Sequence, residues 1–193
     1  MHYLEGQTPL DPDEENDLIP RLTTRDELNA FEQRNIASGL LWARRSRLLR
    51  TDLLNINSLT KLHARMFDQT WRWAGTFRQT GKNIGVEPHQ IRSQLVQLCA
   101  DGRYWLENEV LPLYVCAVRL HHRLVVIHPF PNGNGRHARM VADLLLYFHK
   151  QEALTWGGAS LDVEGETRQQ YLAALREADR GRFKSLLEFA TRR

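Results

Sequence analysis

The sequence predicts an all-α fold, a mainly helical bundle that carries one short β-hairpin. Apolar residues recur at helical spacing along most of the 193 residues. Only the segment 76–86 breaks this pattern, because its β-branched and aromatic residues flank Thr80-Gly81-Lys82-Asn83 and favour a hairpin that turns near Gly81. A chain of this length with 42% hydrophobic residues can bury one sizeable core but not two large ones. We therefore expect one compact domain with an extension.

The extension is expected at the N-terminus. Residues 1–22 are polar and carry three prolines, which predicts an extended arm. A helical region is expected over residues 23–54, because Thr24 and Glu27 have the spacing of a capping box. The apolar residues expected to face inward from this helix are Leu28, Phe31, Ile36 and Leu40. The main domain is assigned to residues 55–193.

Further helices are expected throughout this main domain. One helix is predicted to begin at Ser58. The others are predicted to span 89–106, 112–127, 135–150, 166–179 and 182–191. Pro112 suits the first turn of its helix, and Gly181 suits the joint between the last two helices. The helix over 135–150 is apolar enough to be expected at the centre of the bundle.

Cysteine usage and hydropathy limit the compartments in which the chain is expected. Cys99 and Cys116 are the two cysteines, and neither has the spacing of a zinc or redox motif, so both are expected to be reduced core residues. The N-terminal segment lacks a basic start followed by an apolar run, and no stretch approaches the ~18 apolar residues of a membrane helix. We expect a cytoplasmic protein with no membrane partner.

The net charge of +3 comes mainly from arginines. The densest cluster consists of Arg44, Arg45, Arg47 and Arg50. Clusters of this kind are more often the solvated face of a helix than a nucleic-acid surface. The pattern therefore disfavours nucleic acid as a partner.

The segment from His128 to Arg139 predicts an anion site with a base beside it. Gly133 and Gly135 allow backbone N–H groups to point at a ligand, and the helix that follows adds the positive end of its dipole. Arg136 and Arg139 lie three residues apart on the first turn, where both can reach the oxygens of a phosphate. His128 can accept a proton near neutral pH.

Two other phosphate-binding motifs fit this chain poorly. Gly133-x-Gly135-x-x-Ala138 follows the apolar run 124–127 and formally satisfies a dinucleotide-binding fingerprint. The segments on both sides read as consecutive helices, whereas that fold needs alternating strands and helices. A Walker-type loop is excluded because Asn83 follows Gly81 and Lys82.

Zinc binding and a simple inter-helix turn are the remaining alternatives for the loop. The histidines that could bind zinc are His121, His122, His128 and His137, and they lack a carboxylate partner in the sequence pattern. A tight turn alone would not account for two arginines and a histidine within one short segment. An anion site is therefore the favoured interpretation.

The motif His128-Pro129-Phe130-x-x-Gly133-Asn134-Gly135-Arg136-x-x-Arg139 resembles the signature of the Fic family at all its fixed positions but one. The residues Ala74-Gly75-x-x-Arg78, Tyr171-x-x-Ala174-Leu175 and Gly181-x-Phe183 are also similar to that family, so the resemblance covers about residues 55–190. The arm motif Gly6-x-Thr8-Pro9-Leu10-Asp11-Pro12 resembles the branch named mobile mystery protein B.

The resemblance implies a Fic-type helical bundle in which the hairpin is a flap that docks a target segment. It also implies transfer of AMP from ATP to a Ser, Thr or Tyr hydroxyl of a target protein. His128 would be the general base, Gly133, Asn134 and Gly135 would hold the α-phosphate, Arg136 the β-phosphate and Arg139 the γ-phosphate. A Mg²⁺ ion would bridge the phosphates. The flap residues are Thr80, Gly81, Lys82 and Asn83.

Asn132 is the departure from the family pattern, which usually has Asp or Glu at this position. An amide oxygen can ligate Mg²⁺, but it holds the ion more weakly than a carboxylate. The change would therefore alter metal dependence, the nucleotide or other donor, or activity itself. Gly135 stands where the phosphorylating Doc branch has a lysine, so the chain does not resemble that branch.

Regulation and partners follow from the same resemblance. Many family members place an inhibitory glutamate against the second arginine of the motif, and Glu32 is our candidate, with Arg139 as its expected partner. The alternative is a surface glutamate that pairs with Arg25 or Arg44. A cognate antitoxin-like regulatory protein and a homo-oligomer are further partners that the family admits.

Two functional classes remain open. One is an enzyme that modifies a macromolecular hydroxyl, and it is favoured because His128 and the two motif arginines are intact. The other is a non-catalytic module that binds nucleotide, protein or nucleic acid through the same scaffold.

Overall fold

The computed structural model describes residues 8–158, 161 and 165–192, and within these residues the fold is all-α, as predicted. No strand is present in this part of the chain, where an isolated bridge pairs Leu18 with Trp71. The helices are α1 (Pro12–Asn16), α2 (Arg25–Arg45), α3 (Arg47–Thr51), α4 (Ile56–Phe67), η1 (Pro88–Gln90), α5 (Ile91–Glu107), α6 (Leu113–Ile127), α7 (Asn134–Phe148), η2 (Trp156–Gly158), α8 (Glu166–Asp179) and α9 (Lys184–Thr191).

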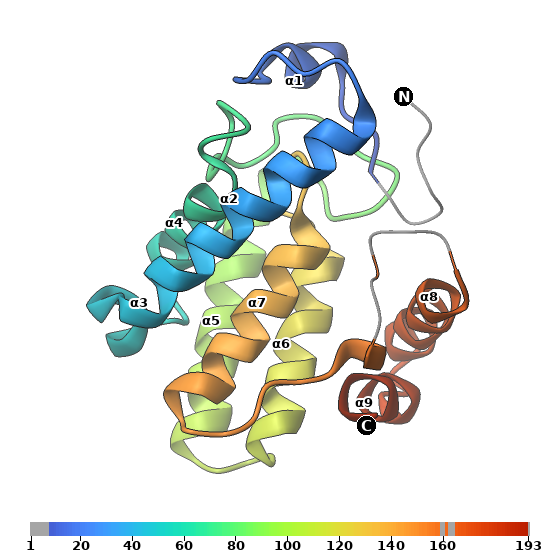
Figure 1. Ribbon diagram of the computed structural model, residues 1–193. Coiled ribbons are helices and arrows are strands. Elements are labelled where there is room, and N and C mark those ends of the chain that lie inside the picture. The colour runs from blue at the N-terminus through green and yellow to red at the C-terminus, as the bar shows by residue number, and fades with distance from the viewer. Residues whose placement is uncertain (1–7, 159–160, 162–164, 193) are drawn as a thin grey trace.

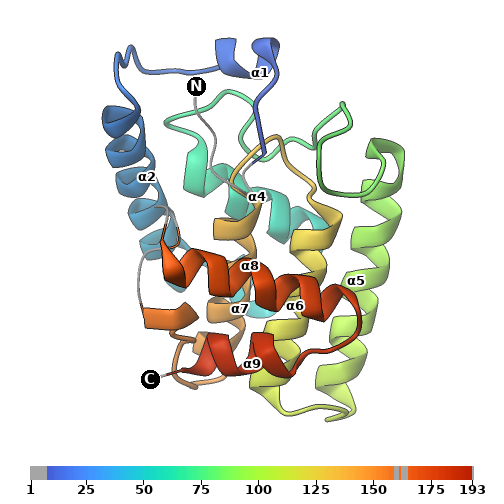
Figure 2. The same ribbon diagram turned by 90° about the vertical axis from the view of Figure 1, so that its right-hand side faces the viewer.

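Helices α6 and α7 form the centre of the bundle (Figure 1). They are joined by the short loop of residues 128–133, and each packs along the other. Helix α5 packs on α6, and α2 packs on α4. The α8 and α9 pair crosses the face of α6 and α7, as Figure 2 shows. None of the helices described here is long and apolar enough to span a bilayer.

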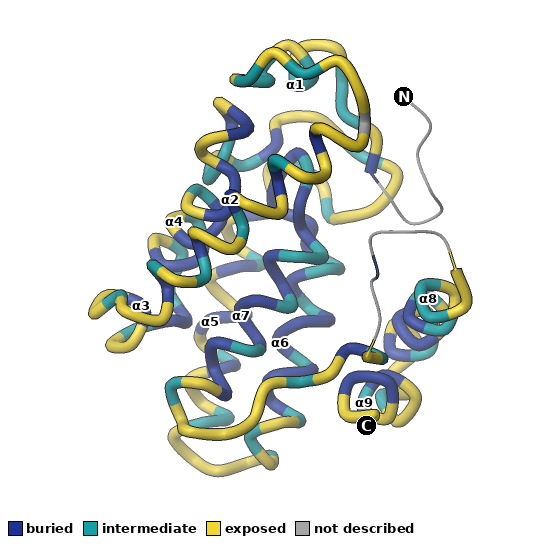
Figure 3. The backbone as a smooth tube through the Cα atoms, viewed as in Figure 1, coloured by how far each residue is buried: buried dark blue, intermediate teal, exposed yellow. Residues whose placement is uncertain are grey.

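The hydrophobic core follows the inner faces of these helices (Figure 3). Helix α7 is buried along most of its length, including Val141, Leu144 and Leu145, so the prediction that it occupies the centre is confirmed. Cys99 and Cys116 are free and buried, as expected. Burial raises the pKa of the Cys99 thiol to about 11, so this thiol stays protonated at neutral pH.

Helix α2 begins as the sequence predicts but turns a different face inward. Thr24 accepts a hydrogen bond from the Glu27 N–H, and Glu27 bonds back to the Thr24 N–H, which confirms the capping box. Leu28 is buried, whereas Phe31, Ile36 and Leu40 are only half-buried. Between them, Glu32, Asn35 and Gly39 form the buried stripe. A Cβ on Gly39 would lie 2.7 Å from the Arg65 carbonyl oxygen, so this face is set by close packing on α4 rather than by hydrophobicity.

Polar caps explain the element boundaries that the sequence pattern misplaced. Helix α4 starts at Ile56, not Ser58, because Asn55 accepts a hydrogen bond from the Asn57 N–H at 2.9 Å. The unpredicted helix α3 begins after Ser46, which caps it. The arm, expected to be extended, contains the short helix α1, and residues 1–7 lie outside the described part of the chain.

The segment 76–86 is not the expected β-hairpin, because its backbone forms no strand ladder. Two of its N–H groups instead donate to the end of α6 and to the loop that follows it, from Val86 to the Ile127 carbonyl at 3.3 Å and from Arg78 to the Pro129 carbonyl at 3.0 Å. We call residues 76–86 the flap segment. It is an irregular loop that lies against the loop of residues 128–133.

Arg78 replaces the hydrogen bonds that a hairpin would have made across its two strands. Its guanidinium is only 2% exposed and donates to the carbonyls of His128 at 2.6 Å, Thr80 at 2.8 Å and Ile127 at 3.5 Å, and also to the carbonyl of Val86. Burial lowers the pKa of Arg78, but its ordinary value is so high that the side chain remains charged. One cation therefore joins both limbs of the flap segment to the end of α6.

We predict that Arg78→Met destabilises the protein by roughly 3 kcal/mol or more. The substitution removes a buried donor from several carbonyls, and each buried acceptor left unpaired costs about 1–3 kcal/mol. Urea unfolding measures the change in the free energy of unfolding. Arg72→Met is the matched control, because Arg72 is exposed and close in sequence. Equal losses in the two variants would contradict the role assigned to Arg78.

Candidate active site

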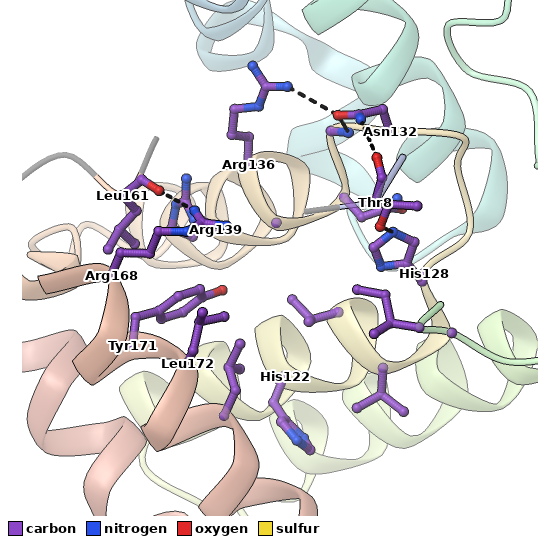
Figure 4. A pocket seen from close by; sticks show the side chains of 18 of the residues that line it. Thr8, His122, His128, Asn132, Arg136, Arg139, Leu161, Arg168, Tyr171 and Leu172 are labelled. Atoms are coloured by element: carbon purple, nitrogen blue, oxygen red, sulfur yellow. Dashed lines mark hydrogen bonds between the residues drawn. The ribbon is translucent and has the colours of Figure 1, made fainter. Parts of the chain in front are cut away.

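A cavity of about 740 Å³ opens in front of the N-terminus of α7. It is bounded by the arm, α2, the flap segment, the end of α6 and α8. Figure 4 shows Thr8 against His128 at one end of this cavity and Tyr171 at the other. The predicted site residues that line it are Glu32, His128, Asn132, Gly133, Asn134, Gly135, Arg136 and Arg139. The fold therefore brings Glu32 of α2 next to the predicted site residues of the segment 128–139.

His128 occupies the turn that ends α6. Its backbone has φ of 52° and ψ of 60°, a left-handed conformation that is uncommon for a residue with a side chain. The imidazole is 6% exposed, and its Nε2 lies 2.7 Å from the hydroxyl oxygen of Thr8. Burial and then the charge of Arg78 lower the pKa of His128 to about 4, so the ring is neutral at pH 7. The Val125 carbonyl opposes this lowering, although it lies outside hydrogen-bond geometry with Nδ1.

Gly133 and Gly135 differ in how much space their surroundings leave for a side chain. Gly133 has a φ of 77°, and a Cβ there would lie 2.6 Å from the ring of Phe67, so both conformation and space demand glycine. A Cβ on Gly135 would meet only the Arg139 guanidinium, at 3.7 Å. The first turn of α7 is thus open on the side that faces the cavity.

Asn134 holds the loop in shape. Its side chain accepts a hydrogen bond from the Phe130 N–H at 2.9 Å and donates to the Phe130 carbonyl at 2.8 Å. Both groups of the amide are therefore used within the loop. This leaves backbone N–H groups, rather than the Asn134 side chain, to face a ligand.

His63 is a supporting residue that sequence reasoning missed. Its Nδ1 accepts a hydrogen bond from the Gly75 N–H at 3.0 Å, so the Nε2–H donates to the Asn132 carbonyl, also at 3.0 Å. The ring stacks on Phe130 with centroids 3.7 Å apart. Burial lowers the pKa of His63 well below its usual value, which keeps it neutral. No motif marks His63, because its role depends on the packing of α4 under the loop.

Glu32 reaches the site, but it pairs with Arg136 and not with Arg139 as predicted. One carboxylate oxygen accepts from the Arg136 guanidinium at 2.6 Å, and the other accepts from the indole N–H of Trp71 at 2.7 Å. Glu32 is 7% exposed, which also rules out a surface pair with Arg44; the side chain of Arg25 lies outside the described part of the chain. The ion pair is therefore enclosed within the cavity wall.

The position of each arginine on α7 explains the change of partner. Arg136 lies on the first turn beside α2, with its guanidinium 5.0 Å from the centroid of the Phe67 ring. Arg139 is one turn further on and lies over the ring of Tyr171 on α8, 5.9 Å from its centroid. The two guanidinium groups are thus held at different walls of the same cavity.

Asn132 does not present its oxygen to a cation. That oxygen accepts from the Gly133 N–H at 2.6 Å and lies 3.5 Å from the Arg136 guanidinium, while the amide nitrogen donates to the Thr8 carbonyl at 3.1 Å. Glu32, the carboxylate beside it, is engaged by Arg136. These residues do not fit the Mg²⁺ ion that the family resemblance implies.

The zinc alternative also fails in the part of the chain that the structure describes, where no cluster of three or more potential ligands occurs. The four histidines face different partners. His121 contacts the Tyr171 hydroxyl, His122 the Asp179 carboxylate, His128 the Thr8 hydroxyl and His137 the Leu59 carbonyl.

The family profile for Fic/DOC proteins matches residues 53–146, which include the loop and both motif arginines. This span contains His128 and the first turn of α7, which line the cavity. Residues 53–146 form a Fic/DOC family domain. The family predicted from the motif is therefore confirmed, and α1, α2, α8 and α9 lie outside the matched residues.

Two curated relatives and one solved structure place the Fic domain among known proteins. The chain is 28% identical over 148 residues to protein adenylyltransferase fic-1 of Caenorhabditis briggsae, which covers 72% of this chain and 27% of the relative. It is 35% identical over 102 residues to a probable protein adenylyltransferase of Aquifex aeolicus, covering 52% of this chain and 28% of the relative. The chain thus spans little more than a quarter of the length of these curated relatives.

BepC, a VirB-translocated effector of Bartonella tribocorum, has the same fold. Its structure has a TM-score of 0.69 and 18% identity, and the similarity covers 94% of this chain and 97% of BepC. The similarity therefore includes regions on both sides of the matched Fic domain.

Buried neutral histidines make the stability of this Fic domain sensitive to acid. Burial lowers the pKa of His63, His121, His128 and His137, to about 4 for the last two. In the unfolded chain the pKa of each histidine is about 6.5. Between this value and the lower pKa of the folded state, the unfolded chain binds more protons than the folded one. The free energy of unfolding should therefore fall as the pH drops from 6.5 toward 4, by at most about 1.4 kcal/mol per pH unit for each histidine.

Thermal unfolding at a series of pH values checks this expectation. In His137→Gln the amide can still donate to the Leu59 carbonyl but cannot be protonated, so Tm should fall less steeply with acid than in the wild type. His89→Gln is the control, because His89 is exposed. Parallel Tm profiles for the wild type and His137→Gln would show that this histidine does not carry the effect.

Proposed function

We propose that the chain transfers AMP from ATP to a Ser, Thr or Tyr hydroxyl of a target protein. One observation carries this proposal: the Nε2 of a neutral His128 lies 2.7 Å from an aliphatic hydroxyl, beside backbone N–H groups at the start of α7. The relatives from Caenorhabditis briggsae and Aquifex aeolicus are named as protein adenylyltransferases, and the BepC structure contains bound AMPPNP. These names support the same reaction class here.

His128 would act as the general base. In the tautomer that carries its proton on Nδ1, Nε2 accepts the hydrogen bond of the attacking hydroxyl and then its proton. The lowered pKa ensures that Nε2 is free of a proton before reaction. Phosphate groups bound nearby would raise this pKa, because negative charge favours the imidazolium, and would so strengthen the base when it is needed.

The first turn of α7 would bind the α-phosphate through backbone N–H groups and the helix dipole. Arg139 lies deeper along the cavity and would bind the γ-phosphate. Arg136 would bind the β-phosphate once its pair with Glu32 opens. As the hydroxyl oxygen bonds to the α-phosphorus, the bond to the β-phosphate oxygen breaks and pyrophosphate leaves, with both arginines compensating its charge.

Glu32 would inhibit this reaction by occupying Arg136. The carboxylate and a nucleotide phosphate compete for one guanidinium, and the Trp71 N–H holds the carboxylate in place. Nucleotide binding would therefore have to displace an enclosed ion pair. Inhibition acts on the phosphates and leaves His128 unaffected.

A non-catalytic module is the second candidate, and the internal contacts of His128 and Arg136 favour it. Thr8 contacts His128 while Glu32 holds Arg136, so both halves of the site are engaged by the chain itself. Incubation with cell lysate and ATP labelled on its α-phosphate separates the two classes. Labelled protein requires transfer, whereas a binding module would retain nucleotide without labelling anything.

We predict that His128→Ala abolishes transfer while ATP affinity remains near that of the wild type. Loss of a general base lowers a rate by about 10²- to 10⁴-fold. Labelling rates and calorimetric ATP binding measure the two effects separately, and His89→Ala is an exposed control. If His128→Ala labelled targets as fast as the wild type, another group would have to be the base.

We predict that Glu32→Gln accelerates labelling by about 10- to 100-fold. The amide keeps an oxygen for the Trp71 N–H but loses the charge that holds Arg136, and a hydrogen bond to a charged group contributes about 1.5–3 kcal/mol. Glu32→Gly should act in the same direction. Ala37→Gly is its matched control, because it places glycine at an exposed position of the same helix.

Labelling of a lysate by the four proteins is compared at equal concentration of folded protein. Glu32→Gln and Glu32→Gly should exceed the wild type, and Ala37→Gly should match it. Equal rates for wild type and both Glu32 variants would refute inhibition by this residue.

A further inference from the structure

We propose that Thr8 is an acceptor hydroxyl, so that the protein transfers a nucleoside monophosphate to its own N-terminal arm. This inference rests on the transferase function proposed above. Thr8 belongs to the arm, and its hydroxyl oxygen lies 2.7 Å from Nε2 of His128. That is the contact which an attacking hydroxyl must make with a general base.

Thr8 is held at two points. Its side chain contacts His128, and its carbonyl accepts a hydrogen bond from the Asn132 amide nitrogen at 3.1 Å. The residue is only 4% exposed. Side chain and backbone are thus fixed together, and Figure 4 shows Thr8 between Asn132 and the imidazole. An arm that merely covered the cavity would not need a hydroxyl at this point.

Asn132 acquires a physical role in this arrangement. Its oxygen is directed at the Gly133 N–H, which leaves the amide nitrogen to donate to Thr8. A carboxylate at this position would have no proton to donate and would face the Thr8 carbonyl with lone pairs alone. The amide that weakens a cation site therefore suits the binding of the arm backbone.

Charged contacts hold the part of the arm that follows Thr8 on the flap segment. Lys82 pairs with Asp11 at 2.9 Å and with Glu14 at 2.5 Å, and the Thr80 hydroxyl donates to Asp11 at 2.6 Å. The Lys82 side chain is 3% exposed and that of Glu14 is 15% exposed, so solvent screens this pair little, whereas the Asp11 side chain is 41% exposed and its pair is more strongly screened. The family resemblance assigns the docking of a target segment to these same flap residues. The arm therefore lies where an acceptor segment would bind.

The reaction on Thr8 balances with a nucleoside triphosphate as co-reactant. The Thr8 oxygen forms a bond to the α-phosphorus, and the bond from that phosphorus to the β-phosphate oxygen breaks. Pyrophosphate leaves with the electron pair, and the hydroxyl proton passes to Nε2 of His128. The product is a phosphodiester on Thr8. Because donor and acceptor are parts of one site, the rate should be independent of protein concentration.

The first experiment incubates Glu32→Gln protein with MgATP and locates the modification by peptide mass spectrometry. We expect one nucleoside monophosphate on Thr8, with a first-order rate that does not change on dilution. Combining Glu32→Gln with Thr8→Val, which keeps the shape of the side chain without its hydroxyl, should abolish the product. Combining Glu32→Gln with Thr8→Ser should retain the modification. Thr51→Val in the same background is the control, because Thr51 is an exposed threonine far along the chain.

The second experiment releases the arm without touching the site. Asp11→Asn combined with Glu14→Gln removes the charge of both acidic partners of Lys82 and leaves its contact with the Pro9 carbonyl, and Thr8 should be modified at least about tenfold more slowly. Labelling of lysate proteins by the same variant should not fall, because neither acid lines the cavity in the part of the chain that the structure describes. Unchanged modification of Thr8 in this variant would overturn the proposed geometry.

The outcomes separate this inference from the transferase function. Labelled lysate proteins with unmodified Thr8 overturn self-modification and leave the transferase intact. Modification of Thr8 whose rate rises with protein concentration overturns transfer within one chain. If neither Thr8 nor any lysate protein is labelled, both proposals fail.

Discussion

The buried guanidinium of Arg78 is the contact on which the geometry of the site depends. It bonds to carbonyls of the flap segment and of the last turn of α6, so the two segments form one unit. The left-handed backbone of His128 is held by the same cation, through its carbonyl. Gly85 permits this approach, because a Cβ there would lie 2.6 Å from the Arg78 guanidinium and 2.7 Å from the His128 Cβ. Arg78 therefore couples the position of His128 to that of the flap segment.

The charges around the cavity suit an anionic ligand but are satisfied internally. Arg136 and Arg139 line it together with the carboxylate of Glu32, which pairs with the first of them. The positive charge of Arg78 lowers the pKa of His128, after burial the largest cause. A triphosphate would reverse both effects, because it would compete with Glu32 and would raise the pKa of the base. In the proposed reaction, binding of the triphosphate would thus make His128 a stronger base.

Local patterns made much of this molecule predictable, whereas contacts between distant segments did not follow from them. The capping box at Thr24 and the loop that precedes α7 are local features, and residue spacing alone predicted the position of both. The prediction of a hairpin was wrong because the Arg78 side chain makes the hydrogen bonds that were expected between two strands. The partner of Glu32 depends on how α2 crosses α7, and Thr8 lies 120 residues before the base that it contacts. No spacing rule reaches that far.

In the proposed reaction, the contacts of Glu32 and Thr8 would affect different halves of the site. Glu32 pairs with Arg136, the proposed phosphate ligand, whereas Thr8 contacts His128, the proposed base. They share a link at Asn132, whose oxygen lies near Arg136 and whose nitrogen holds Thr8. If the Glu32–Arg136 pair alone were lost, a nucleotide could bind while Thr8 still occupied the acceptor position. The Thr8 hydroxyl would then be the first acceptor that the bound nucleotide meets. In the proposed reaction, access by another protein would require the arm to leave, and the ion pairs at Lys82 would contribute to the free energy of that step.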